Sequence, residues 1–195
     1  MIRIGILGDI GSGKSFVAQS FGYPVFDADM EVSKLYRSDK KTFNKLRKVI
    51  PEHISSYPVD KKEITGAILA KKSNLKKIVK IIHLEVRKKM HFFLKKNKNK
   101  KIVILDIPLL LENKINIKND ILIFVYANKS VVKTRLHKRS NFNEKLMTKF
   151  RDIQLPLDYK KKKSKFTINN NFSIKSKNSA TISLNFFLSD KNSLV

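Results

Sequence analysis

The segment Gly8-Asp9-Ile10-Gly11-Ser12-Gly13-Lys14-Ser15 decides how this chain folds. It matches the pattern G-x-x-x-x-G-K-[ST], in which glycines allow backbone N–H groups to converge on phosphate oxygens. The apolar run 2–7 before it predicts a short buried strand, and residues 15–21 after it have helical spacing. A phosphate loop needs this setting, because the helix that follows offers its N-terminus to the anion. The segment therefore predicts a nucleotide site.

Two side chains of this loop have predicted roles of their own. Lys14 would reach the β- and γ-phosphates of a bound nucleotide, and the Ser15 hydroxyl would ligate Mg²⁺. The cofactors expected from the motif are thus ATP and Mg²⁺.

Short apolar strands alternate with helical stretches along the rest of the chain. Further strands are predicted at 23–26, 101–107, 121–126 and 166–168. Helices are predicted across 30–90 with breaks near Pro51, Pro58 and Ser73-Asn74, and at 129–139, 144–153 and about 180–188. This alternation predicts an α/β fold with a parallel sheet of about five strands, covered by helices on both faces.

Composition limits the class of protein. A length of 195 residues suits one domain with insertions. The net charge of +26 is spread over nearly every polar stretch, as in the lysine run 160–163, and this favours solvated helix faces over a nucleic-acid partner. The absence of cysteine excludes disulfides and thiolate metal sites. No segment reaches about 18 uninterrupted apolar residues, so we expect a cytoplasmic protein without a membrane partner.

Acidic residues follow two of the predicted strands. Asp27-Ala28-Asp29 ends the second strand, and Asp106 ends the strand at 101–107. Ligands of parallel sheets bind at the carboxyl ends of the strands, where the glycine loop and the turn 169–171 also lie. A carboxylate at this edge can accept a proton from an attacking hydroxyl or hold Mg²⁺, and Asp106 has the position of a Walker B acid. The alternative for Asp27 and Asp29 is a helix-capping role.

With these pieces the chain resembles the dephospho-coenzyme A kinase family over roughly residues 2–171. The matching pieces are the phosphate loop, Asp27-Ala28-Asp29, His83, Asp106-Ile107-Pro108-Leu109-Leu110-Leu111-Glu112, Arg135 with Arg139, Gln154-Leu155-Pro156 and Asn169-Asn170-Asn171. The resemblance implies a P-loop NTPase fold. It also implies transfer of the ATP γ-phosphate to the ribose 3′-hydroxyl of dephospho-coenzyme A, the last step of coenzyme A biosynthesis.

The family implies a three-part build within a single domain. The nucleotide core would comprise about 1–29, 100–134 and 164–195, the helical substrate-binding region about 30–99, and the lid about 135–163. We expect a monomer or a weak homo-oligomer whose partner is the small-molecule substrate.

Carried over by position, the resemblance implies a role for each matching residue. As catalytic residues it implies Asp29 as general base, Lys14 on the phosphates and Arg139 as the transition-state clamp. ATP would be bound by Gly8, Asp9, Ile10, Gly11, Ser12, Gly13, Lys14, Ser15, Phe16, Arg135, Arg139 and Asn170. The substrate would be bound by Asp27, Asp29, Lys61, His83, Arg87, Asp106, Pro108 and Leu109. Mg²⁺ would be held by Ser15 and Asp106.

Alternatives remain for several of these side chains. Arg135 and Arg139 are spaced to share one helix face, which either points at phosphates or is a solvated basic face. His83 is either a positioning residue or a structural histidine. The chain departs from the family pattern at Leu7, Asp9, Lys61, Leu84, Ser140, Asn169 and Phe172.

Two other functions compete with this interpretation. One is a different P-loop small-molecule kinase that acts on a nucleoside monophosphate or a related alcohol. The other is a nucleotide-binding regulatory protein without kinase turnover, which would bind ATP but release no ADP in response to an acceptor.

Overall fold

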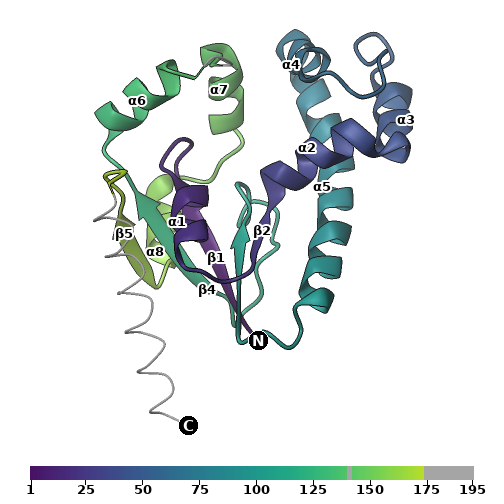
Figure 1. Ribbon diagram of the computed structural model, residues 1–195. Coiled ribbons are helices and arrows are strands. Elements are labelled where there is room, and N and C mark those ends of the chain that lie inside the picture. The colour runs from purple at the N-terminus through teal and green to yellow at the C-terminus, as the bar shows by residue number, and fades with distance from the viewer. Residues whose placement is uncertain (140–141, 174–195) are drawn as a thin grey trace, which may run out of the picture. The chain divides into compact units, whose positions relative to one another are not determined.

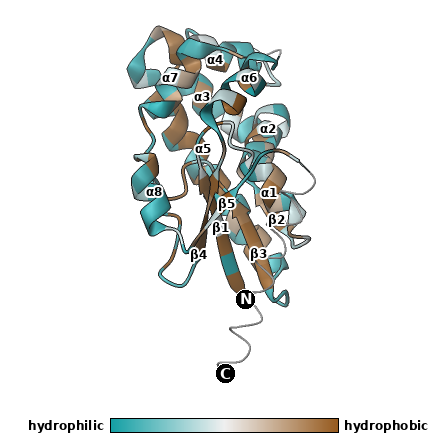
Figure 2. Cartoon of the chain, turned by 90° about the vertical axis from the view of Figure 1, so that its left-hand side faces the viewer, coloured by the Kyte–Doolittle hydropathy of each residue, from teal (hydrophilic) through white to brown (hydrophobic). Residues whose placement is uncertain are grey.

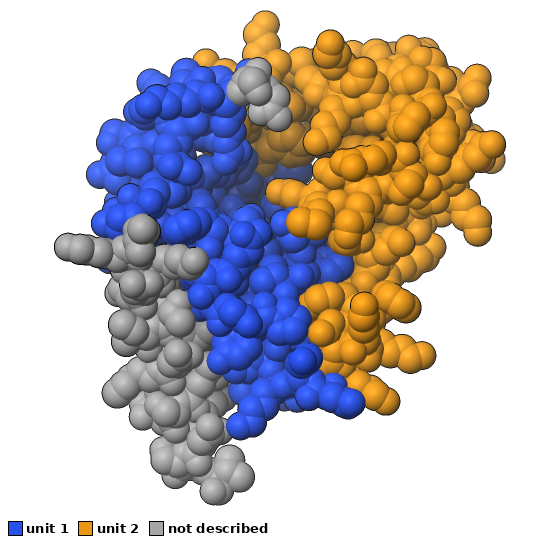
Figure 3. Space-filling view, in the orientation of Figure 1, with its two compact units in different colours: residues 1–27, 99–142, 153–195 blue, residues 28–98, 143–152 orange. Residues whose placement is uncertain are grey.

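The computed structural model describes residues 1–139 and 142–173 (Figure 1). The chain divides into two compact units, coloured separately in Figure 3. Unit 1 comprises residues 1–27, 99–142 and 153–195, and unit 2 comprises residues 28–98 and 143–152.

Unit 1 contains a five-stranded sheet in the order β2-β3-β1-β4-β5. Every neighbouring pair in this sheet is parallel. The strands are β1 (Ile2–Gly8), β2 (Val25–Asp27), β3 (Ile102–Asp106), β4 (Ile121–Tyr126) and β5 (Phe166–Asn169). The predicted α/β class with a parallel sheet of about five strands is confirmed.

Helices on both faces of the sheet explain why its strands are apolar throughout. Helix α1 (Lys14–Ser20) packs on β1 and β3, and α8 (Leu157–Lys163) packs on β1 and β4. The sheet lies between these two helices in both views (Figures 1 and 2). Because both faces are covered, β3 reads as a continuous apolar run, and Ile104 and Leu105 are fully buried although they point to opposite faces. Unit 1 also contains α6 (Lys129–His137).

Unit 2 is built from helices alone within its described residues. They are α2 (Ala28–Ser38), α3 (Lys40–Val49), α4 (Lys61–Ala70), α5 (Lys72–Lys96) and α7 (Glu144–Arg151). One face of α5 is buried, and it carries Ile78, Ile82, Val86 and Met90 at helical spacing. The helices α2, α3 and α4 contact α5, and α7 contacts α4.

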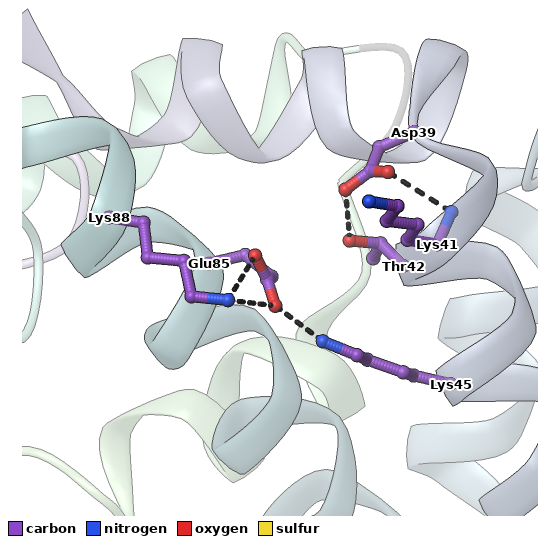
Figure 4. Close-up of polar contacts among 6 residues, drawn as sticks. All are labelled: Asp39, Lys41, Thr42, Lys45, Glu85 and Lys88. Atoms are coloured by element: carbon purple, nitrogen blue, oxygen red, sulfur yellow. Dashed lines mark hydrogen bonds and ion pairs between the residues drawn. The ribbon is translucent and has the colours of Figure 1, made fainter. Parts of the chain in front are cut away.

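Polar contacts fix the start of α3 and its approach to α5 (Figure 4). The Asp39 carboxylate caps α3, accepting the Lys41 N–H at 3.0 Å and the Thr42 hydroxyl at 2.7 Å. Glu85 on α5 accepts Lys45 Nζ from α3 at 2.6 Å and Lys88 Nζ at 3.1 Å. These contacts link two helices that are distant in sequence.

The structure corrects the predicted helix boundaries in unit 2. The predicted break near Ser73-Asn74 is confirmed, although it lies slightly earlier, because both residues are in the first turn of α5. The chain breaks at Lys71, whose backbone is extended, and the Asn74 side chain donates to the Ala67 carbonyl across this break at 3.0 Å. A break at Asp39 was not predicted, although an Asp at this position is a strong cap.

Two further differences concern unit 1 and the end of the chain. Helix α8 was not predicted, since its residues Leu157–Lys163 end in four lysines without an apolar period. The predicted helix at about 180–188 lies outside the described residues. Among the helices of the described ranges, none has the length and apolar character to cross a membrane.

Candidate functional site

The glycine segment forms a loop between β1 and α1, as the motif requires. Its turn is closed by the Ser12 N–H, which donates to the Asp9 carbonyl at 3.2 Å. Gly13 has a left-handed backbone with φ 85° at the N-cap of α1. A Cβ on Gly13 would come within 2.2 Å of Asn170 Nδ2, so only glycine fits there.

Polar groups of this loop are arranged for an anion. Lys14 Nζ donates to the Asp9 carbonyl at 2.8 Å and the Gly8 carbonyl at 3.3 Å, which holds the ammonium group over the loop. The buried Ser12 Oγ has no hydrogen-bond partner among the described residues. Burial of an unpaired hydroxyl is costly, and a phosphate oxygen would satisfy it. The loop therefore fits a bound phosphate.

Asp9 places a carboxylate in this loop. Its Oδ1 accepts the N–H of the next residue, Ile10, at 2.7 Å. The Asp9 carboxylate is thus hydrogen-bonded to the backbone of its own loop.

The register of the sheet brings acidic residues together at its carboxyl edge. Asp27 at the end of β2 is paired with Asp106 at the end of β3, and Asp106 is buried. The phosphate loop follows β1, the neighbour of β3, at the same edge. Asp29 is the second residue of α2, directly after β2, and belongs to unit 2.

Asn170 ties the end of β5 to the phosphate loop. Its Nδ2 donates to the Ser12 carbonyl at 2.9 Å, and its backbone N–H donates to the Tyr126 carbonyl at 2.8 Å. The Asn170 Oδ1 accepts the N–H of Phe172 at 2.9 Å. Asn170 is buried, so these bonds fix the wall of the loop beside Gly13.

Phe172 and Arg135 form a stacked pair beside this wall. The Arg135 Cζ lies 3.9 Å from the centre of the Phe172 ring. Phe172 has a positive φ of 63°, which is rare for a bulky residue, and its ring edge also lies against Gly13. Phe172 appeared in the sequence only as a departure from a family pattern, and nothing in its spacing indicates this contact.

Arg139 lies outside the helix in which it was expected. Helix α6 ends at His137, and Lys138 is its C-cap. The Arg139 N–H bonds to the Leu136 carbonyl, three residues back, at 3.1 Å, so the backbone tightens past the helix end. The predicted common helix face for Arg135 and Arg139 is therefore wrong.

The remaining predicted residues are divided between the units. Pro108 and Leu109 lie in the turn that follows β3 in unit 1. Lys61 begins α4 in unit 2, and His83 and Arg87 lie one turn apart on α5, where they share a face. Unit 1 alone thus assembles the phosphate loop, Asp27, Asp106, Asn170 and Arg135.

The donor set fits a hard cation with few protein ligands. Within residues 1–139 and 142–173, no group of three or more His, Asp or Glu side chains is placed to hold a metal ion. Mg²⁺ typically takes one or two protein oxygens and completes its shell with phosphates and water. Ser15 in the loop and Asp106 at the neighbouring strand end supply oxygens of this kind.

Comparison with known proteins agrees with this geometry. A family model described as dephospho-CoA kinase matches residues 2–176. The chain belongs to the dephospho-CoA kinase family. The "Dephospho-CoA kinase" of Wolbachia sp. subsp. Brugia malayi is 37% identical over 175 residues, which cover 87% of this chain and 89% of the relative. That of Zymomonas mobilis is 32% identical over 180 residues, covering 89% and 90%.

Solved structures give the same assignment at the level of the fold. A Thermus thermophilus protein superimposes with a TM-score of 0.76 at 26% identity, covering 97% of both chains. The dephospho-CoA kinase from Campylobacter jejuni gives a TM-score of 0.64 at 20% identity, covering 97% of this chain and 98% of the other. A shikimate kinase from Acinetobacter baumannii gives 0.54 at 16% identity, covering 98% and 95%. Membership of the dephospho-CoA kinase family makes this chain an ATP-dependent kinase of coenzyme A biosynthesis.

Proposed function

We propose that this chain transfers the γ-phosphate of ATP to the ribose 3′-hydroxyl of dephospho-coenzyme A through the residues described above. The observation that carries the proposal is the pairing of Asp27 with Asp106 at the sheet edge that also bears the phosphate loop. Phosphoryl transfer requires a site for the phosphates of ATP and a carboxylate that can accept the proton of the acceptor hydroxyl, and family membership names the acceptor.

The phosphates of ATP lie on the loop in this proposal. The N–H groups of residues 11–15 and the start of α1 bind the phosphate oxygens, and Ser12 Oγ gains the partner that it lacks. Lys14 leaves the carbonyls of Gly8 and Asp9 and spans the β- and γ-phosphates. Phe16 follows the loop on α1, and Asn170 holds the wall beside it.

Asp29 serves as the general base. Its carboxylate accepts the proton of the 3′-hydroxyl, and that oxygen forms a bond to the γ-phosphorus while the bond to the β–γ bridging oxygen breaks, which releases ADP. Asp27 supports this site as the residue that ends β2, directly before the helix that carries Asp29. Arg139 and Arg135 supply positive charge to the transferred phosphoryl group and the nucleotide.

Ser15 and Asp106 hold Mg²⁺ in this proposal. The ion would supply charge neutralisation on the β- and γ-oxygens when bound. The position of its strand beside β1, the strand that leads into the loop, supports this role for Asp106.

The remaining residues bind dephospho-coenzyme A in the proposed enzyme. Lys61, His83 and Arg87 supply donors from the helical unit, and Pro108 and Leu109 supply apolar surface from the turn after Asp106. The segment from about 135 to 163 acts as a lid that excludes water, which suppresses hydrolysis of ATP. We further propose a monomer or weak homo-oligomer in the cytoplasm; the absence of cysteine suits a reducing compartment.

One experiment tests the reaction class and the acceptor together. ADP release from Mg·ATP is measured with purified protein, with and without dephospho-coenzyme A, and the product is identified by mass. Strong stimulation with formation of coenzyme A is the expected result. ATP binding without acceptor-dependent ADP release would reject the proposal.

A further inference from the structure

Lys160 is the most buried lysine among the described residues, with 1% of its side chain exposed. It belongs to a run of four lysines on α8, and the other three are exposed. A lysine is almost never fully buried unless it is paired. The high lysine content of the surface therefore does not explain why Lys160 is buried.

The partners of Lys160 come from two separate segments. Its Nζ lies 2.7 Å from Glu112 Oε1 and donates to Gln154 Oε1 at 3.0 Å. The same Glu112 oxygen accepts the N–H of Leu155 at 3.0 Å. These four residues are called the Glu112 cluster below. The cluster joins the turn after β3, the segment 153–156 and helix α8.

The cluster lies where the chain returns to unit 1. The chain passes from unit 2 to unit 1 between Asp152 and Ile153, directly after α7. Gln154 and Leu155 are thus among the first residues of unit 1 after this passage, and both are held by the cluster. Since α8 packs on β1 and β4, the returning chain is fixed to the sheet that carries the phosphate loop.

Stability alone is a weak reason for such a pair. Replacing a buried ion pair by apolar side chains of similar volume is often neutral or stabilising, because both charges lose their hydration. The second oxygen of the pair, Glu112 Oε2, is buried without a hydrogen-bond partner among the described residues, which adds to the cost. The pair instead fixes the position of the backbone at Leu155, because Glu112 Oε1 pairs with Lys160 Nζ and also accepts the Leu155 N–H.

We infer that Lys160, through Glu112, is a positioning residue for phosphoryl transfer. It fixes the segment 153–156 as the stationary end of the proposed lid, so that the lid closes in one geometry and excludes water from the γ-phosphate. This inference rests on the proposed function. A loosened end would lower transfer to dephospho-coenzyme A and raise hydrolysis of ATP by water, without changing the phosphate loop.

The deciding variant is the double substitution Glu112→Leu/Lys160→Met. It replaces the pair by apolar side chains of similar volume and leaves no buried charge behind. Lys160→Met alone is the companion variant, and it leaves Glu112 buried without its cation, so it is expected to melt at a lower temperature. The control is Lys161→Met, which removes the exposed neighbour on α8.

Four quantities are measured for each variant: coenzyme A formed per ADP released, the kcat of transfer, the Kd for ATP and the melting temperature. The double variant is expected to melt near the wild type and to bind ATP with wild-type Kd. Its kcat should fall about tenfold to a hundredfold, as expected for misplacement far from the chemistry, and its yield of coenzyme A per ADP should fall as well.

The outcomes separate this inference from the proposed function. A double variant with wild-type kcat and wild-type yield would overturn the positioning role, whatever happens to the melting temperature of Lys160→Met. A wild-type protein that forms no coenzyme A would reject the proposed function instead. An unchanged Lys161→Met protein is required for the effect to be assigned to the buried position.

Discussion

Asp27 and Asp106 are register partners at the carboxyl ends of the neighbouring parallel strands β2 and β3. Neighbouring strands lie about 4.8 Å apart, so this register brings two carboxylates to one point of the sheet edge. Two negative charges at that spacing repel each other, and a nearby cation offsets the repulsion. The loop that carries Lys14 follows β1, the strand next to β3. The fold thus gathers acidic and basic side chains at one sheet edge, where we propose that phosphoryl transfer takes place.

Replacing Asp29 by asparagine tests the general base. Loss of the proton acceptor should reduce dephospho-coenzyme A-dependent ADP release by about a hundredfold or more, because general base catalysis contributes that much. The Kd for ATP should not change, since Asp29 lies on α2 and not in the phosphate loop. Glu31→Gln is the control in the same helical turn, where Glu31 pairs with Lys34 at 2.6 Å. Turnover of Asp29→Asn at the wild-type rate would remove this residue from catalysis.

Replacing Lys14 by alanine tests the phosphate contact. The variant should lose about a hundredfold or more in kcat, the usual effect of removing a donor aimed at developing charge. The fold should persist, since the Lys14 ammonium donates to the Gly8 and Asp9 carbonyls within its own loop. Steady-state kinetics and circular dichroism measure the two effects. Lys129→Ala, an exposed position at the start of α6, should behave as the wild type, and similar losses in both variants would contradict the assignment.

A pair of glycine substitutions separates the loop from an ordinary helix position. Gly13→Ala should weaken ATP binding and lower the melting temperature, because its Cβ would meet Asn170 Nδ2 at 2.2 Å and its φ is 85°. Gly66→Ala is the matched control within α4, where a Cβ meets nothing within 4 Å. It should stabilise the protein by about 0.5–1 kcal/mol through helix propensity. Isothermal titration with ATP and thermal melting measure the pair. Intact ATP binding in Gly13→Ala would contradict the described loop wall.

The sequence predicted the sheet well because its strands carry a strong signal. Strands β3 and β4 are covered on both faces, so they read as unbroken apolar runs at nearly the observed bounds. The phosphate loop was equally plain, because its function depends on residue types at fixed spacing. Parallel strands then place their carboxyl ends at one edge, which predicted that Asp27, Asp106 and the loop would share it.

Features that depend on packing could not be predicted from the sequence. Lys160 looks like its exposed neighbours in a lysine run, and only the tertiary contact with Glu112 distinguishes it. The end of α6 at His137 is set by a backbone bond three residues back, which leaves no mark on residue type. The stack of Phe172 on Arg135 needs a positive φ that aromatic residues rarely adopt.

Glu85 predicts a pH dependence of stability in unit 2. The hydrogen bond from Lys45 and then that from Lys88 hold the pKa of this carboxyl below its usual range. Because the pKa is lower in the folded state, the contribution is present above the unfolded value of about 4.3 and is lost as the pH falls through the folded pKa. Glu85→Gln should therefore be less stable than the wild type at pH 7, and this difference should shrink below about pH 4.

The size of this effect follows from the exposure of the two lysines. Lys45 and Lys88 have 45% and 60% of their side chains exposed, so solvent screens both ion pairs. A difference of about 1 kcal/mol or less is expected at pH 7, or about 2–4 °C in melting temperature, and it should decrease with added salt. Glu52→Gln is the control, since Glu52 lies 4.0 Å from Lys71 and is 73% exposed. A melting difference for Glu85→Gln that stays constant from pH 7 to pH 3 would mean that lost packing, and not the charge on Glu85, accounts for it.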